Sequence, residues 1–238
     1  MEWLSDFRRR AGDGVGDAAD EDLCRLYAIS RVATQLLLRF QSGRADGTDY
    51  PGPEILVEGY QLFFESLGFH VPEAKEFHPF FHEVVTVEGV DRIVPVQVTA
   101  RNWPPLMLGN MMFARGGVAI SASTTDVVKE IAERSKMYWA NRRKNRPCED
   151  QSHGWGSNSQ WRTALRRDYR LANGYCYNID AEVSLNDPDA DVWDLDRDTM
   201  IELVRHRCLV RAADNDVDLY PYRYSYLERT SADAGSMS

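Results

Sequence analysis

Residues 166–180 read RRDYRLANGYCYNID and decide the β part of the fold. The pair Asn173-Gly174 lies between two runs of alternating side chains, and Asn-Gly favours a two-residue type I′ hairpin turn. This register places Arg167 opposite Asp180 across the hairpin. Because side chains alternate between the two faces of a sheet, Arg167 shares a face with Asp180 and Arg166 lies on the opposite face.

Further β-rich runs lie on both sides of this hairpin. Residues 83–88 and 93–99 are rich in β-branched side chains, and the GVDR sequence between them predicts a second hairpin. Residues 118–123 predict a short strand, and residues 219–227 predict a last one. The sheet is therefore expected to be mixed or antiparallel and built from hairpins.

Helical patterns complete an α+β fold. The acids of DAADED precede an amphipathic stripe over residues 21–40, and a second helix is expected from Pro53 to Gly68. Thr124, Thr125 and Asp126 predict the start of a long central helix over 124–144. A C-terminal helix is expected over 198–211. The layout thus has two N-terminal helices, a long central helix and a C-terminal helix.

Composition shifts divide the 238 residues into three parts. Residues 1–20 are rich in Gly, Asp and Ala and are expected to be disordered, as is the tail 229–238. Between them, residues 21–228 contain no linker and no internal repeat. We therefore expect a single α+β domain there.

The overall charge and the cysteine pattern limit the class of protein. The net charge is −9, which argues against nucleic acid as a partner, because phosphate contacts need a dominant positive field. No run approaches the ~18 apolar residues of a membrane span, and the N-terminus does not resemble a secretory signal. Four widely spaced cysteines form no C-x-x-C pair and indicate reduced thiols. We expect a soluble, cytoplasmic protein without a membrane partner.

Positive charge is concentrated in one part of this acidic chain. Residues 141–170 hold eight Arg and Lys side chains against three acids. A local basic region on an acidic protein suits a small anionic ligand better than a long polyanion. An anion site is therefore expected near these residues.

The segment 152–163 combines the residue types of a small-molecule pocket. It contains an imidazole, two indoles, hydroxyls, carboxamides, a guanidinium and two glycines. Indoles supply apolar walls and the polar groups supply directed hydrogen bonds. The candidate binding residues are Trp155, Ser157, Asn158, Gln160, Trp161, Arg162, Arg166 and Arg167.

These residue types suggest roles in an enzyme. His153 has a reference pKa of ~6.5 and suits acid-base work near neutral pH. Arg162, with Arg166 or Arg167, would anchor an anion through paired hydrogen bonds. Arg167 has a structural alternative, an ion pair with Asp180. The whole segment also has one, since loops rich in Gly, Ser and Asn often satisfy their own backbone.

A second pattern, His78-x-x-x-His82-Glu83, is a candidate site for a divalent metal. On a helix, histidines four residues apart share one face and could hold zinc or iron, with Glu83 or a distant residue as a third ligand. The alternative is that these histidines belong to an aromatic connection between helix and strand and bind no metal.

Three functions remain open from the sequence. The leading hypothesis is an enzyme that binds a small anionic molecule, of undefined reaction class, with His153 as acid or base and arginines as anion anchors. The second is a metal-dependent enzyme that uses His78, His82 and Glu83. The third is a non-catalytic inhibitor or adaptor whose acidic surface meets a basic protein partner.

Overall fold

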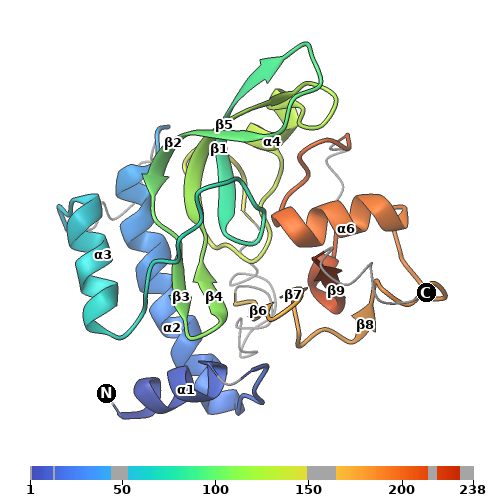
Figure 1. Ribbon diagram of the computed structural model, residues 1–238. Coiled ribbons are helices and arrows are strands. Elements are labelled where there is room, and N and C mark those ends of the chain that lie inside the picture. Colours follow the sequence, from blue (N-terminus) through green and yellow to red (C-terminus); the bar gives the residue numbers. More distant parts are fainter. Residues whose placement is uncertain (1, 13, 44–52, 149–164, 214–218, 231–238) are drawn as a thin grey trace.

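The computed structural model describes all residues except 1, 13, 44–52, 149–164, 214–218 and 231–238, and it has the expected α+β fold. Figure 1 shows α1, α2 and α3 on one side of the molecule and α6, β8 and β9 on the other, with the remaining strands between them. Two sheets are present in the described residues. One has the strand order β1-β5-β2, and the other has the order β3-β4-β6-β7-β9-β8.

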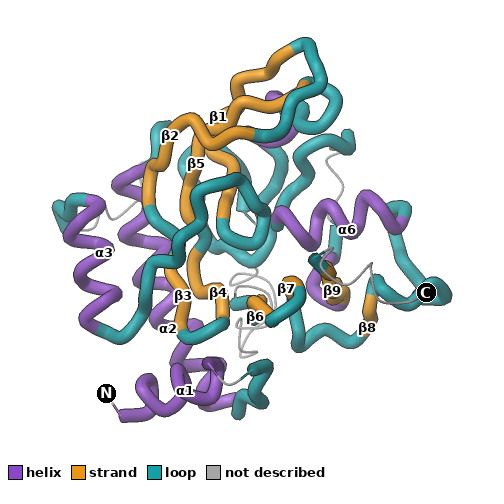
Figure 2. The backbone as a smooth tube through the Cα atoms, in the orientation of Figure 1, coloured by secondary structure: helices purple, strands orange, loops and turns teal. Residues whose placement is uncertain are grey.

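The elements of the described chain have the following bounds. The helices are α1 (Glu2–Gly12), α2 (Asp20–Leu37), α3 (Val57–Ser66), α4 (Lys129–Arg134) and α6 (Arg197–His206), with short 3-10 turns η1 (Leu38–Phe40) and η3 (Pro221–Arg223). The strands are β1 (His82–Val90), β2 (Gln97–Trp103), β3 (Leu106–Leu108), β4 (Met111–Ala114), β5 (Gly116–Ser123), β6 (Asp168–Leu171), β7 (Gly174–Tyr177), β8 (Val183–Ser184) and β9 (Tyr224–Arg229). Figure 2 shows that the strands are short and that loops connect them over much of the chain.

The helix predicted over 21–40 is confirmed as α2 followed by η1. Asp20, Glu21 and Asp22 occupy its first turn, where negative charge complements the helix dipole. The C-terminal helix is confirmed as α6, although it ends at His206 rather than at 211. Arg207 follows the last helical residue and adopts a left-handed conformation, with φ of 65°. Its backbone N–H donates to the carbonyl oxygen of Leu203, and this hydrogen bond caps the helix.

The prediction of a disordered N-terminus is wrong for residues 2–12, which form α1. Leu4, Phe7 and Ala11 are buried in the same core cluster as α2. Their spacing of three and four residues makes one apolar helical face. The Gly-, Asp- and Ala-rich composition after residue 11 obscures this short amphipathic pattern.

The long central helix predicted over 124–144 is also wrong, because only α4 is helical there. Met137, Tyr138, Trp139 and Ala140 are all buried, and four consecutive buried side chains cannot lie on one helical face. Trp139 has a φ of 53°, which no α-helix continues through. Burial of this apolar run in the core therefore replaces the helix.

The hairpin predicted for 83–88 and 93–99 is not formed. β1 and β2 both pair with β5, which lies between them, parallel to β1 and antiparallel to β2. The strand predicted over 118–123 thus becomes the centre of this sheet. Its eight residues are mostly buried, and central strands of this kind gain apolar neighbours on both sides.

The Asn-Gly hairpin is confirmed, with a shift in register. Leu171 pairs with Gly174, so the turn residues are Ala172 and Asn173, whereas the expected turn was Asn173-Gly174. Gly174 instead begins β7. A Cβ at this position would collide with the carbonyl oxygen of Glu228 in β9, so the close pairing with β9 requires glycine here. The shift moves each partner by two residues, so the predicted faces are unchanged.

The core divides into three clusters of buried side chains. The largest joins α1, α2 and α3 to the β3–β4 hairpin, a second packs α6 against β7 and β9, and the third surrounds β5. The candidate site described below lies where the first two clusters meet. None of the helices in the described residues combines the length and apolar character needed to cross a bilayer.

Candidate functional site

Most of the predicted binding segment lies outside the described residues. This holds for the candidates between 151 and 163, which are His153, Trp155, Ser157, Asn158, Gln160, Trp161 and Arg162. Their convergence stays a prediction. Arg166 and Arg167 are described, and they have different environments.

Arg166 belongs to a buried cluster of three arginines around Asp168, which we call the arginine cluster. The Oδ2 atom of Asp168 accepts a hydrogen bond of 2.6 Å from Arg166 Nη2, and it lies 3.3 Å from Arg207 Nη2 and 3.5 Å from Arg115 Nη2. The Oδ1 atom accepts the backbone N–H of Asn178 at 2.8 Å. The carboxylate of Asp168 is fully buried, and so is Arg166.

Three distant elements position these guanidinium groups. Arg166 precedes β6 by two residues, and Arg207 projects from the left-handed C-cap of α6. Arg115 joins β4 to β5, and its carbonyl oxygen accepts a hydrogen bond of 2.9 Å from the buried Trp103 indole. A Cβ on Gly117 would overlap the Trp103 ring, so glycine is required for this packing.

Several N–H groups of the arginine cluster and of the neighbouring Trp139 have no hydrogen-bond partner among the described residues. They are Arg115 Nε and Nη1, Arg166 Nε, Arg207 Nε and Trp139 Nε1. The Arg166 guanidinium also lies over the Trp139 ring, 4.3 Å from its centroid. Buried N–H groups normally have a partner, because leaving one unsatisfied costs about 1–3 kcal/mol. This part of the structure therefore has unused donor capacity.

The pKa shifts of the cluster also indicate an excess of buried positive charge. Burial lowers the pKa of Arg115 well below its usual value, and the positive charges of Arg207 and Arg166 lower it further. Burial also lowers the pKa of Arg166 to about 10, although Asp168 opposes this shift. Burial alone would raise the pKa of Asp168, but the three arginines hold it below its usual value. One carboxylate thus faces three cations.

A small cavity of about 30 Å³ adjoins the cluster. Arg115, Arg166 and Arg207 line it together with Trp139, Leu165 and the α2 residues Ser30, Ala33, Thr34 and Leu37. Arg143 also borders it, but Glu83 already binds this guanidinium through two hydrogen bonds of 2.7 and 2.8 Å. Two positive charges of the arginine cluster therefore remain without a counter-charge among the described residues.

Arg167 has the structural role that the sequence offered as an alternative. Its guanidinium forms the predicted ion pair with Asp180, with an Nε–Oδ2 distance of 2.7 Å, and donates to the carbonyl oxygen of Gly16 at 2.6 Å. These contacts attach the segment before α2 to the hairpin. Arg167 is thus occupied, and Arg166 is the arginine of the pair that faces the cavity.

The metal site predicted from His78, His82 and Glu83 is not assembled. The Glu83 carboxylate is buried in its ion pair with Arg143. Each histidine instead accepts a backbone hydrogen bond at Nδ1, His78 from Phe80 and His82 from His78. No group of three His, Cys, Asp or Glu side chains in the described part of the chain is arranged to hold a metal. The helix required for the predicted ligand geometry does not form, because β1 starts at His82.

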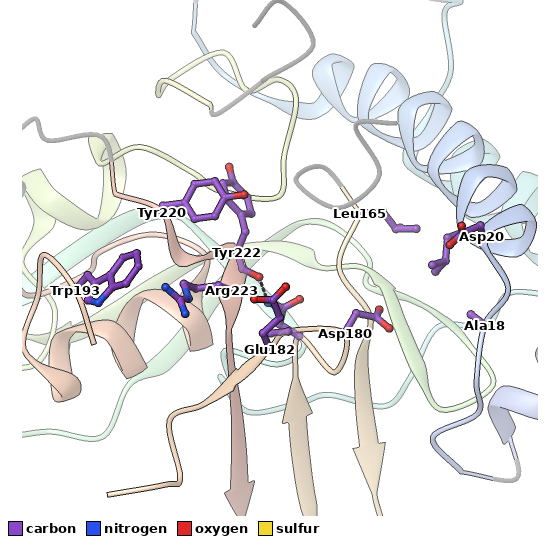
Figure 3. Close-up of a pocket in the computed structure, with 12 residues that line it drawn as sticks. Ala18, Asp20, Leu165, Asp180, Glu182, Trp193, Tyr220, Tyr222 and Arg223 are labelled. Atoms are coloured by element: carbon purple, nitrogen blue, oxygen red, sulfur yellow. Dashed lines mark hydrogen bonds between the residues drawn. The ribbon is translucent and has the colours of Figure 1, made fainter. Parts of the chain in front are cut away.

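A second and larger recess, the Trp193 hollow, has a volume of about 630 Å³ and shares Leu165 as a wall with the small cavity. Figure 3 shows Trp193, Tyr220, Tyr222 and Arg223 on one side, Ala18, Asp20 and Leu165 on the other, and Asp180 and Glu182 between them. Its volume is in the usual range for small-molecule pockets, about 300–1,000 Å³. Leu165 therefore lies between two recesses of different character.

Sequence reasoning did not identify Arg115, Arg207 or Asp168. One available signal was Arg115 itself, a single charge between the apolar run 111–114 and the run 116–123. A charged residue inside such a pattern is expected to be buried with a partner. Arg207 has no comparable signal, because it follows a helix where basic residues are common.

The fold and the site thus define an α+β protein with a buried, positively charged cluster beside a cavity. No protein-family model matches this chain, and neither the curated proteins nor the solved structures include a significant match.

Proposed function

We propose that this protein binds a small anionic molecule through Arg115, Arg166 and Arg207 and acts on it as an enzyme. The observation that carries the proposal is the set of buried guanidinium N–H groups without a partner beside a cavity. Guanidinium groups bind carboxylates and phosphates with directed, charge-assisted hydrogen bonds. An anion at this place would accept the unused donors.

The charge balance supports the same conclusion. Burying an uncompensated cation is unfavourable, and like charges close together add to the cost. Asp168 offsets one of the three arginines, and a bound anion would offset a further charge. An anion would therefore raise the lowered pKa values of Arg115 and Arg166 toward their usual range.

The size of the cavity limits which part of a ligand it accepts. A volume of about 30 Å³ has room for only a few atoms. The cavity therefore suits the charged end of a ligand, such as a carboxylate, rather than a whole molecule.

The predicted segment 152–163 supplies the other groups in this proposal. It is joined to the cavity wall by the chain itself, since Arg162 precedes Leu165 by three residues. His153 would transfer a proton, Trp155 and Trp161 would form walls, and Ser157, Asn158, Gln160 and Arg162 would donate or accept hydrogen bonds. Reaction at a held anion by a neighbouring acid-base residue is a common arrangement in enzymes.

Calorimetric titration with acetate, sulfate and inorganic phosphate at low ionic strength tests anion binding. We expect saturable binding of at least one anion to the wild-type protein. Ala33→Val fills the cavity without removing a charge, and Arg207→Met removes one donor; both should weaken binding by about tenfold or more. The matched control, Arg92→Met, alters an exposed arginine in the β1–β2 connection and should bind normally.

Two results would contradict the proposal. One is the absence of saturable binding for all three anions, and the other is normal binding by Ala33→Val that folds like the wild type. His153→Ala and Arg162→Ala test the predicted segment separately. Weaker ligand binding with an unchanged melting temperature supports its role in the pocket, whereas an equal loss of stability indicates a structural loop.

A further inference from the structure

From the Trp193 hollow we infer a second binding site, for a small organic cation with an ammonium or guanidinium group. This site is separate from the arginine cluster and has the opposite charge preference. Its features are exposed aromatic side chains, two carboxylates without a cation partner among the described residues, and a ligand-sized volume. Each feature comes from described residues.

Two aromatic side chains of the hollow are unusually exposed. Trp193 is 54% exposed and Tyr220 is 53% exposed, and they are the Trp and the Tyr among the large exposed apolar side chains of the described chain. Both line the hollow, and Tyr222 packs edge-on against Tyr220 with ring centroids 5.0 Å apart. Large exposed rings that gather in one recess are typical of a ligand site rather than of random surface.

One ring of the hollow already holds a cation. The Arg223 guanidinium lies 4.2 Å from the centroid of the Trp193 ring. The negative face of an aromatic ring attracts cations in this geometry. Tyr220 lies on the same side of the hollow in Figure 3. No cation among the described residues lies over its ring, so this ring offers a comparable face to a ligand.

The hollow is also lined by three carboxylates, which attract a cation. Asp180 is occupied by Arg167. Asp20 at the start of α2 and Glu182 before β8 are exposed, and the described residues provide no ion pair for either of them. A cation between these acids and the Tyr220 ring would combine charge pairing with a cation–π contact. The walls therefore favour a ligand that is positively charged and partly apolar.

Butylguanidinium and its neutral isostere butylurea test this inference by titration with NMR or calorimetric detection. We expect butylguanidinium to bind at least about tenfold more tightly than butylurea, because only the cation can pair with the acids. Glu182→Gln and Tyr220→Ala should each weaken butylguanidinium binding by about two- to fivefold. Both residues are exposed, so the variants are expected to fold normally.

The matched control is Glu130→Gln, which removes an exposed acid on α4, outside the residues that line the hollow. It should bind butylguanidinium like the wild type. Equal affinity for the two probes would overturn the inference. Wild-type affinity in the Glu182→Gln/Tyr220→Ala double variant, or an equal loss in the Glu130→Gln control, would overturn it as well.

Discussion

Lowering the pH from 7 to 4.5 is expected to destabilise this protein through a group of packed histidines. The ring of Phe77 stacks between His82 and His206, with centroid distances of 5.9 and 6.2 Å. The Nδ1 atom of His82 accepts the backbone N–H of His78 at 3.2 Å, and His78 Nδ1 accepts that of Phe80 at 3.1 Å. A protonated Nδ1 cannot accept a hydrogen bond, so charging either ring breaks its contact.

The magnitude follows from the pKa shifts. Burial, reinforced by Arg101, lowers the pKa of His82 from 6.5 to about 4. Burial also lowers that of His78 to about 4; Glu228 opposes this shift and Arg205 adds to it. In the unfolded chain these rings bind protons at higher pH than in the folded protein. Their stabilising contribution is therefore complete above pH 6.5 and is lost as the pH falls toward 4.

For His82, which is 2% exposed, the full loss corresponds to about 3 kcal/mol. His78 has a more exposed side chain, so its protonation lowers the free energy of unfolding by less. Burial lowers the pKa of His206 as well, with further effects of Arg205 and Arg115, so this ring acts in the same direction. Together these groups approach a large part of the ~5–15 kcal/mol that stabilises a typical domain.

Urea unfolding at half-unit steps between pH 7 and 4.5 measures this effect. Burial opposes ionisation of Asp168 and Glu83, but their arginine partners hold both pKa values below the usual range. These two ion pairs are therefore lost only at a pH below the range of this experiment. His82→Asn keeps an acceptor near Nδ1 and cannot titrate there. It should reduce the slope below pH 6.5 by up to about 1.4 kcal/mol per pH unit. An unchanged slope in this variant, or a flat profile in the wild type, would refute the reasoning.

Three further predictions concern packing and charge. Asp168→Asn leaves the arginine cluster without its carboxylate and should lower the free energy of unfolding by about 3–5 kcal/mol; a loss under 1 kcal/mol in urea titration would contradict the proposed charge balance. Gly174→Ala should disrupt the β7–β9 pairing and lower the melting temperature strongly, whereas Gly12→Ala, with open space around its Cβ position, should not; equal melting temperatures would show that β9 can move aside. Arg197→Met removes the donor that binds carbonyl oxygens in the loop 185–190, so hydrogen exchange in that loop should rise, and unchanged exchange rates would argue against this role.

Local sequence patterns predicted the elements whose cause is local. The stripe of residues 21–40 contains enough apolar side chains at helical spacing to define α2 without other information. The Asn-Gly pair located the β6–β7 turn, and the faces of the hairpin were correct. The two-residue register error came from Gly174, whose position depends on the approach of Arg229 and its neighbours in β9, 55 residues further along the chain. The sequence of the hairpin alone does not predict the contact with β9.

Elements whose cause is tertiary were predicted incorrectly. Residues 83–88 and 93–99 have strand propensity, but propensity does not say which strand becomes the neighbour. β5 pairs with both and prevents the hairpin. In the same way, the helical propensity that follows Thr124 yields to the burial of residues 137–140 in the core. In both regions packing decided between locally acceptable structures.

The arginine cluster shows how far a sequence can define such a site. Arg166 and Asp168 are two residues apart before and within a strand, so alternation alone places them on one face, opposite Arg167. Arg115 and Arg207 reach the same carboxylate across 53 and 39 residues, and no local pattern predicts that approach. Neutralising one buried carboxylate requires a single guanidinium. Burying the second and third guanidinium groups without a counter-charge is unfavourable. Such an excess of charge is characteristic of binding sites, which is why we propose an anion site here.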